Sequence, residues 1–379
     1  MRSAFPLERL NPEEVQLFLV GQALSRIYTP LHATFREKSG LEGFIECPVA
    51  VLIVAEALQQ RYPAHIAGHQ VVVTLPPVDM NAMNVERPPL EEPEWHFRGI
   101  RLPANEVASA YADGPLWGEV THRAGDVGLP MAAEVKRLRT IVEADTDDAG
   151  VRMLAEDIAR GAPAWWQSVA AWIEVLYQQD LSRLGPTAPG WHFNGTTLWT
   201  QLEGDDDENQ VTFLAAQPGR YVMPPYSPLT AGKLRHCMKA AQNHGMPSAA
   251  WLFLRDARSM YLGYDHRRAA IDAGTAAEVG VTQMITTHLS KKGFDDTEVD
   301  QILHRRTLGQ LCRYWLDECD GALPDRYRER LVDVRNDATH IKRSVGRTQA
   351  KDAIVVAAEI VAAADSPDLR PPVEEQAAT

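Results

Sequence analysis

Residues 329–361 read ERLVDVRNDATHIKRSVGRTQAKDAIVVAAEIV and contain two helical patterns separated by a break. The first pattern opens after Pro324 and continues to Thr339, while the second is rich in Ala, Val and Ile. Gly346 interrupts the two patterns, and Thr348 is a residue type that favours the N-cap position. The stretch therefore predicts a helix at 325–339, a short connection and a second helix at 348–364.

The sequence that precedes this pair also favours helices, from residue 229 onward. The longest pattern covers residues 265–288 and places small or apolar side chains on one face, at Ala269, Ala273, Ala277, Val281 and Met284. Shorter helical patterns flank it, at 230–243, 248–262, 296–303 and 308–319. Because helices joined by short connections are typical of a bundle, we expect an all-α bundle at 246–365.

Residues 1–245 show a mixed pattern. Runs rich in Val and Ile predict strands at 43–54, 69–75, 96–102 and 116–122. Helices are predicted after the start signal Asn11-Pro12 and at 131–144 and 163–184. Residues 192–202 and 210–216 predict a hairpin around the acidic run 203–208, and the proline-rich run 76–93 predicts a loop or linker between two subdomains.

The chain is therefore expected to be an α+β protein with a mixed region at 1–245, whose role the sequence does not give. A C-terminal helical bundle follows at 246–365. Residues 366–379 are rich in Pro and Glu and are expected to form a disordered tail.

Charge and cysteine usage limit the classes of function. The net charge of −13 argues against charge-driven nucleic-acid binding over the whole surface. Charge within 255–365 is nearly balanced, so a locally basic cleft remains open there. The four cysteines lack zinc-ligand or C-x-x-C spacing. Together with the absence of a signal-peptide or membrane-span pattern, this indicates a reduced, cytoplasmic protein without a membrane partner.

The sequence gives little support for calcium binding, base stacking or the other catalytic motifs considered. The acidic run 203–208 lacks the spaced ligands of a calcium loop, which favours a solvated loop. Trp165, Val169 and Trp172 recur at helical spacing, which favours core packing over base stacking. The sequence contains no H-E-x-x-H, G-x-S-x-G, Walker loop or G-x-G-x-x-G pattern. We therefore expect no metal and no cofactor.

Three C-terminal stretches together resemble the HEPN family. They are RRAAIDAGTAAEVGVTQMITTHL at 267–289, RTLGQLCRYW at 306–315, and the stretch at 329–361. The third contains Arg335-Asn336-Asp337-Ala338-Thr339-His340, which matches the family's R-x4-6-H motif with a polar residue after the Arg. The resemblance implies a HEPN-type helical domain that acts as a metal-independent endoribonuclease in stress response, toxin action or phage defence. It also implies a homodimer in which two motifs face one cleft.

The motif residues suit metal-free RNA cleavage, in which the 2′-OH is the nucleophile. His340 is the natural candidate for exchanging the required protons, because histidine is the commonest general acid and base. Arg335 offers a planar fork of donors for the charge on the phosphorane, and Asn336 can orient the phosphate or the imidazole. Five residues turn a helix by about 500°, which leaves the two side chains about 140° apart. They therefore share a face only if the helix ends before His340.

The alternative is that the motif residues are ordinary surface groups. Arg335 would then pair with a nearby acid such as Glu329, Asp333 or Asp337, and His340 would be a helix-terminal residue favoured by the dipole. Some HEPN-like proteins bind a nucleotide, RNA or a partner protein without cutting. Glu278 on the long helix is either a supporting group in the cleft or a surface glutamate. Residues 1–245 could respond to an unidentified partner or trigger.

Overall fold

The computed structural model of the chain describes residues 40–82, 87–91, 117–124, 129–143, 148–184, 198–203, 210–216, 227–340 and 344–365. The chain divides into two compact units, one formed by Met1–Trp172 with Pro228–Met246 and the other by Ile173–Ser227 with Pro247–Thr379. The first is mixed and the second largely helical, so the protein is α+β, as expected. The second unit includes residues 173–227, which the sequence pattern assigned to the N-terminal region. The helix predicted after Asn11-Pro12, the strand predicted at 96–102 and the tail predicted at 366–379 lie outside the described residues.

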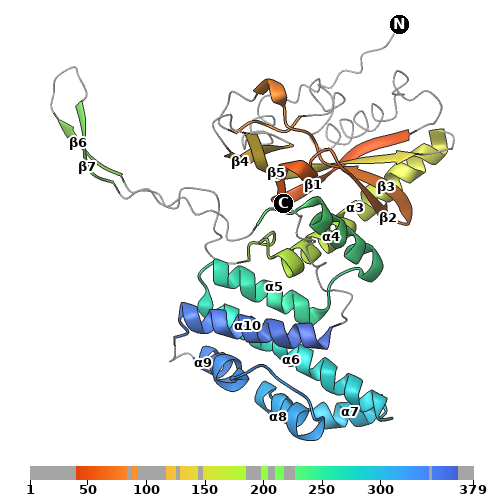
Figure 1. Ribbon diagram of the computed structural model, residues 1–379, viewed down its shortest axis with the longest axis vertical. Coiled ribbons are helices and arrows are strands. Elements are labelled where there is room, and N and C mark those ends of the chain that lie inside the picture. Colours follow the sequence, from red (N-terminus) through yellow and green to blue (C-terminus); the bar gives the residue numbers. More distant parts are fainter. Residues whose placement is uncertain are drawn as a thin grey trace, which may run out of the picture. The chain divides into compact units, whose positions relative to one another are not determined.

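An antiparallel sheet dominates the first unit (Figure 1). Its described strands are β1 (Gly40–Val54), β2 (Arg61–Ile66), β3 (His69–Thr74), β4 (Gly118–Ala124) and β5 (Leu129–Glu143). The strand order is β1-β5-β3-β2, and β4 also pairs with β5. Short 3-10 turns follow β1 at Ala55–Ala57 and lie at Met80–Ala82, within the predicted proline-rich loop.

Strand β5 corrects the prediction of a helix at 131–144. Ala, Glu, Lys, Arg and Leu fill this segment and favour a helix locally. The strand instead forms backbone ladders with β1, β3 and β4. Leu138, Thr140 and Val142 alternate as buried residues on one face, so sheet pairing overrides the local preference.

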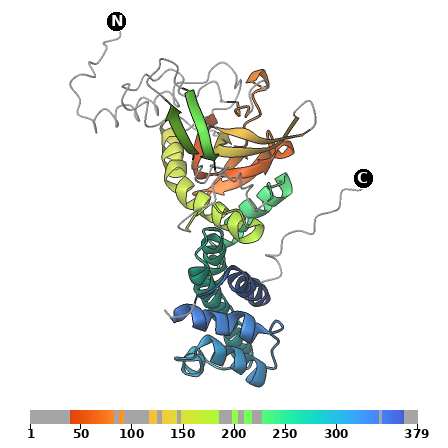
Figure 2. The ribbon, with the colours of Figure 1, turned by 90° about the vertical axis from the view of Figure 1, so that its left-hand side faces the viewer.

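Helix α3 (Asp148–Tyr177) starts earlier than the predicted 163 and ends before the predicted 184. It lies beside the sheet (Figure 2). In the β2–β3 hairpin, His69 Nε2 is 3.5 Å from Asp157 Oδ2 of α3. Trp165, Trp166 and Trp172 are buried, in agreement with core packing. The Trp172 indole donates a hydrogen bond to the carbonyl of Gly245, 2.8 Å away, just beyond α4 (Ala231–His244).

The described parts of the second unit are the end of α3 with the segment after it, a hairpin and a helical bundle. Strands β6 (Leu198–Glu203) and β7 (Gln210–Ala216) pair antiparallel, as predicted. The bundle contains α5 (Ala249–Leu262), α6 (His266–Lys291), α7 (Asp296–Leu303), α8 (Leu308–Glu318), α9 (Asp333–Thr339) and α10 (Arg347–Ala364). These bounds follow the predicted helices closely, except that residues 328–332 form a π-helix before α9. None of the described helices is long and apolar enough to cross a membrane.

Helix α6 is central to the bundle. It packs against α5, α8, α9 and α10, with α5 on one side and α7–α9 on the other (Figure 1). Its predicted small-residue face is buried at Ala269, Ala273 and Ala277. The predicted N-cap at Thr348 is wrong, because Gly346 holds that position and its backbone N–H donates to the Gln349 side chain at 2.9 Å. Helix α10 therefore begins one residue earlier than predicted.

Candidate functional site

The motif lies on the last helix before a break in the chain. Helix α9 ends at Thr339, and His340 leaves it with φ −88° and ψ 117°. The Thr339 hydroxyl donates to the Asn336 carbonyl at 2.7 Å, which closes the final turn. His340 is exposed at the helix end, so the 140° separation expected for an unbroken helix does not apply. Asn336 is exposed on α9 itself.

The side chain of Arg335 lies across α6 at Gly274. A β-carbon added to Gly274 would stand 2.4 Å from Arg335 Cγ, well inside ordinary carbon–carbon contact. Glycine at this position therefore allows α9 to approach α6 with an arginine stem between them. This contact holds the aliphatic part of Arg335 and leaves its guanidinium at the edge of the interface, where the side chain is 28% exposed.

Glu278 lies one helical turn further along α6 and meets the guanidinium. Its Oε2 atom is 3.6 Å from Arg335 Nη2, and the Glu278 side chain is 35% exposed. Arg335 Nε is buried and has no hydrogen-bond partner among the described residues. The supporting glutamate suggested by the sequence thus contacts the motif arginine, and the acid that pairs with Arg335 comes from another helix.

Arg267 ties the start of α6 to the end of α9. Its Nε donates to the Ala338 carbonyl at 2.7 Å. This carbonyl is in the last turn of α9, where helices leave acceptors unsatisfied and the dipole favours a cation. Arg267 therefore fixes the turn that carries His340. The sequence placed Arg267 on the long helix, but nothing in the spacing indicated that its partner is a backbone carbonyl 71 residues away.

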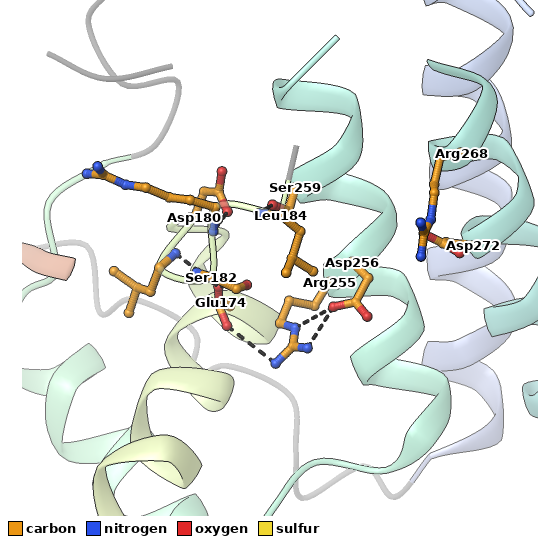
Figure 3. Close-up of polar contacts among 11 residues, drawn as sticks. Glu174, Asp180, Ser182, Leu184, Arg255, Asp256, Ser259, Arg268 and Asp272 are labelled. Atoms are coloured by element: carbon orange, nitrogen blue, oxygen red, sulfur yellow. Dashed lines mark hydrogen bonds and ion pairs between the residues drawn. The ribbon is translucent and has the colours of Figure 1, made fainter. Parts of the chain in front are cut away.

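A second polar cluster in the helical unit surrounds a buried carboxylate (Figure 3). Glu174 accepts hydrogen bonds from the backbone N–H groups of Leu181 and Ser182, at 2.9 and 2.6 Å. Arg255 of α5 approaches the other carboxylate oxygen at 3.6 Å. Burial raises the pKa of Glu174, against the effect of these hydrogen bonds and of Arg255. The cluster attaches the segment after α3 to α5.

The same close-up shows a pair within α6, formed by Asp272 and Arg268 at 3.7 Å. Burial also raises the pKa of Asp272. Within the described parts of the chain, no three His, Cys, Asp or Glu side chains gather in a way that could hold a metal ion. The contacts of Glu174 thus join two segments of the helical unit, whereas Arg335 and Glu278 lie in the motif region between α6 and α9.

Comparisons with known proteins give no match to a family model, a curated protein or a solved structure. The assignment of function therefore depends on the chemistry of the motif region.

Proposed function

We propose that the helical unit is a HEPN-type domain and that the protein is a metal-independent endoribonuclease acting through Arg335, Asn336 and His340. The observation that carries the proposal is the end of α9 at Thr339. Because the helix ends there, the imidazole of His340 is exposed, and the side chain of Arg335, less than two turns earlier, is partly exposed. Arg335 and His340 are thus both accessible to solvent, one on a short helix and the other at its end.

In this proposal the RNA supplies its own 2′-OH as nucleophile. His340 takes or returns a proton, because an imidazole is a common general acid and base and that of His340 is exposed. Arg335 stabilises the charge on the phosphorane with its fork of donors. Asn336 orients the phosphate or the imidazole. The products carry 2′,3′-cyclic phosphate ends, and no metal takes part.

Cleavage requires both a base and an acid, whereas each chain offers one motif histidine. A twofold homodimer through the helical unit supplies two histidines and two arginines, and such dimers are the commonest symmetric assembly. We propose this composite cleft as the active form. A cytoplasmic protein acting in stress response, toxin action or phage defence is the matching biological role.

One observation favours a second candidate function. The guanidinium of Arg335 is already paired with Glu278 at 3.6 Å, which reduces the positive charge available to a phosphate. A protein that binds nucleotide, RNA or a partner through this face without cutting would tolerate that pair. The two functions differ in whether RNA is broken.

The experiment is incubation of the purified protein with total RNA in EDTA. His340→Ala is the test variant, and His304→Ala is the matched control, because His304 is also an exposed residue at a helix C-terminus. The proposal expects cleavage by the wild type and by His304→Ala, and none by His340→Ala. Cleavage that needs magnesium, or that survives His340→Ala, contradicts it.

A further inference from the structure

Four side chains gather where the turn between α5 and α6 meets the start of α10. The ring of His266 lies 5.5 Å from that of Tyr261 and 6.2 Å from that of Tyr264. Arg347, the first residue of α10, donates from Nε to the Tyr261 hydroxyl at 3.1 Å. Its guanidinium carbon stands 5.9 Å from the centre of the Tyr261 ring. Three rings and one cation therefore form a continuous cluster.

Tyr264 is the most unusual member of this cluster. Its side chain belongs to a residue that is 59% exposed, although tyrosine is a large and partly apolar residue. Its backbone has φ +65°, a left-handed conformation that suits Gly or Asn and strains a bulky side chain. An exposed aromatic held in a strained turn is a feature from which a functional role can be inferred.

The polar groups around the rings leave the cluster open to an anion. Arg347 uses Nε for Tyr261, and no ion pair of its guanidinium is found among the described residues. Asp265, which separates Tyr264 from His266 in the chain, accepts a hydrogen bond from the Arg268 backbone N–H at 3.0 Å. The nearest acidic residue in the sequence is therefore engaged in capping α6.

The cluster lies next to the proposed catalytic motif. Arg267 directly follows His266 and donates to the Ala338 carbonyl, two residues before His340. The turn between α5 and α6, the end of α9 and the start of α10 thus meet at one end of the bundle. An RNA strand with one nucleotide bound on the cluster could therefore place a neighbouring nucleotide at the motif region.

We propose that Tyr261, Tyr264, His266 and Arg347 form a subsite for single-stranded RNA beside the scissile phosphate. A base stacks on Tyr264, and Arg347 contacts the adjoining phosphate. Duplex RNA keeps its bases stacked within the helix, so the subsite selects unpaired nucleotides. Every base offers a flat face, so little sequence preference is expected. This inference rests on the proposed function, because the motif defines the cleavage point.

The test measures binding of a short, labelled, mixed-sequence single-stranded RNA to the full chain carrying His340→Ala, which prevents cleavage. Tyr264→Gly added to this parent should weaken binding by roughly 5- to 150-fold, the range expected for one lost stacked base. Its melting temperature should not fall, because glycine suits the backbone at φ +65°. Tyr264→Asn is a second variant that tolerates this conformation, and Tyr264→Phe should retain binding.

Phe294→Ala is the matched control. Phe294 is another exposed aromatic residue, and it follows the opposite end of α6, about 40 Å away by the helical rise. Binding by this variant should equal that of the parent. Binding that is unchanged in Tyr264→Gly and Tyr264→Asn, or a parent that binds no RNA, overturns the subsite.

The two proposals fail in different ways. If Tyr264→Gly weakens RNA binding but the wild type cuts no RNA, the subsite stands and the ribonuclease proposal falls. If the wild type cuts RNA, and the Tyr264 substitutions neither weaken binding in the His340→Ala parent nor slow cutting in an otherwise wild-type chain, the ribonuclease stands and the subsite falls.

Discussion

Gly274→Ala tests whether the contact between α6 and Arg335 controls the motif. The added β-carbon would lie 2.4 Å from Arg335 Cγ and 3.0 Å from its Cβ. Ordinary carbon contacts are about 3.5–4.0 Å, so the arginine must shift by about 1 Å. A misplacement of about 1 Å can cost a catalytic group about 100-fold in rate. We therefore expect RNA cleavage to fall by about that factor.

Gly280→Ala provides the matched control on the same helix. Its added β-carbon would meet Ile360 Cγ2 at 3.4 Å, an ordinary contact. Both substitutions gain about 1 kcal/mol of helix propensity. At Gly280 this gain should raise the melting temperature by about 2–4 °C. At Gly274, overpacking costs about 1–3 kcal/mol and leaves a net loss of about 0–2 kcal/mol.

The assay compares cleavage rates and thermal melts of the two variants with those of the wild type. Both variants should remain folded, and only Gly274→Ala should lose activity. If Gly274→Ala cuts RNA as fast as Gly280→Ala, the position of Arg335 across α6 does not govern catalysis. Equal stabilisation of the two variants would also contradict the close contact at Gly274.

Three further predictions follow from the same geometry. A mixture of the Arg335→Ala and His340→Ala chains should regain part of the activity if each cleft pairs Arg from one chain with His from the other. Size measurements should show dimers in every sample. A monomer with full cleavage activity would exclude the composite cleft. Glu278→Gln should bind RNA more tightly, because it removes the negative charge that pairs with Arg335. It should change the free energy of unfolding by under about 1 kcal/mol, because the ion pair is partly exposed. Weaker RNA binding by this variant would make Glu278 a positioning group. Burial raises the pKa of Glu174, so the folded state holds this proton at a pH where the unfolded chain has lost it. Wild-type stability relative to Glu174→Gln should therefore fall as pH rises from below the ordinary glutamate pKa through the raised folded value, as measured by denaturant unfolding; a difference independent of pH would refute this.

The helical part of the fold was predictable because its patterns are local. The 3.6-residue spacing and the break at Gly346 mark helices and a helix end directly in the sequence. Strand β5 was not predictable in this way, because its residues favour a helix until three other strands pair with it. Alternation at Leu138, Thr140 and Val142 was the available signal, and the flanking Ala, Lys and Arg residues obscured it.

The motif region shows the same limit. The end of α9 near Thr339 could be inferred from the break that follows it. The partners of Arg335 could not, since Gly274 and Glu278 are about 60 residues away and their contact depends on how α6 and α9 cross. The nearby acids Glu329 and Asp333 were reasonable partners by spacing, yet the described ion pair is with α6.

The π-helix at Arg328–Val332 determines how the helix that carries the motif responds to a change in chain length. Its widened turn, closed by the hydrogen bond from the Asp333 N–H to the Arg328 carbonyl, holds one more residue than an α-helical turn. The wider turn takes up that residue within one revolution, so α9 keeps the face that it would have in an unbroken α-helix one residue shorter. Deleting one residue from this segment would therefore restore a regular turn and leave Arg335 against Gly274. An extra residue between Asp333 and Arg335, in the regular part of α9, would instead turn the arginine away by about 100°.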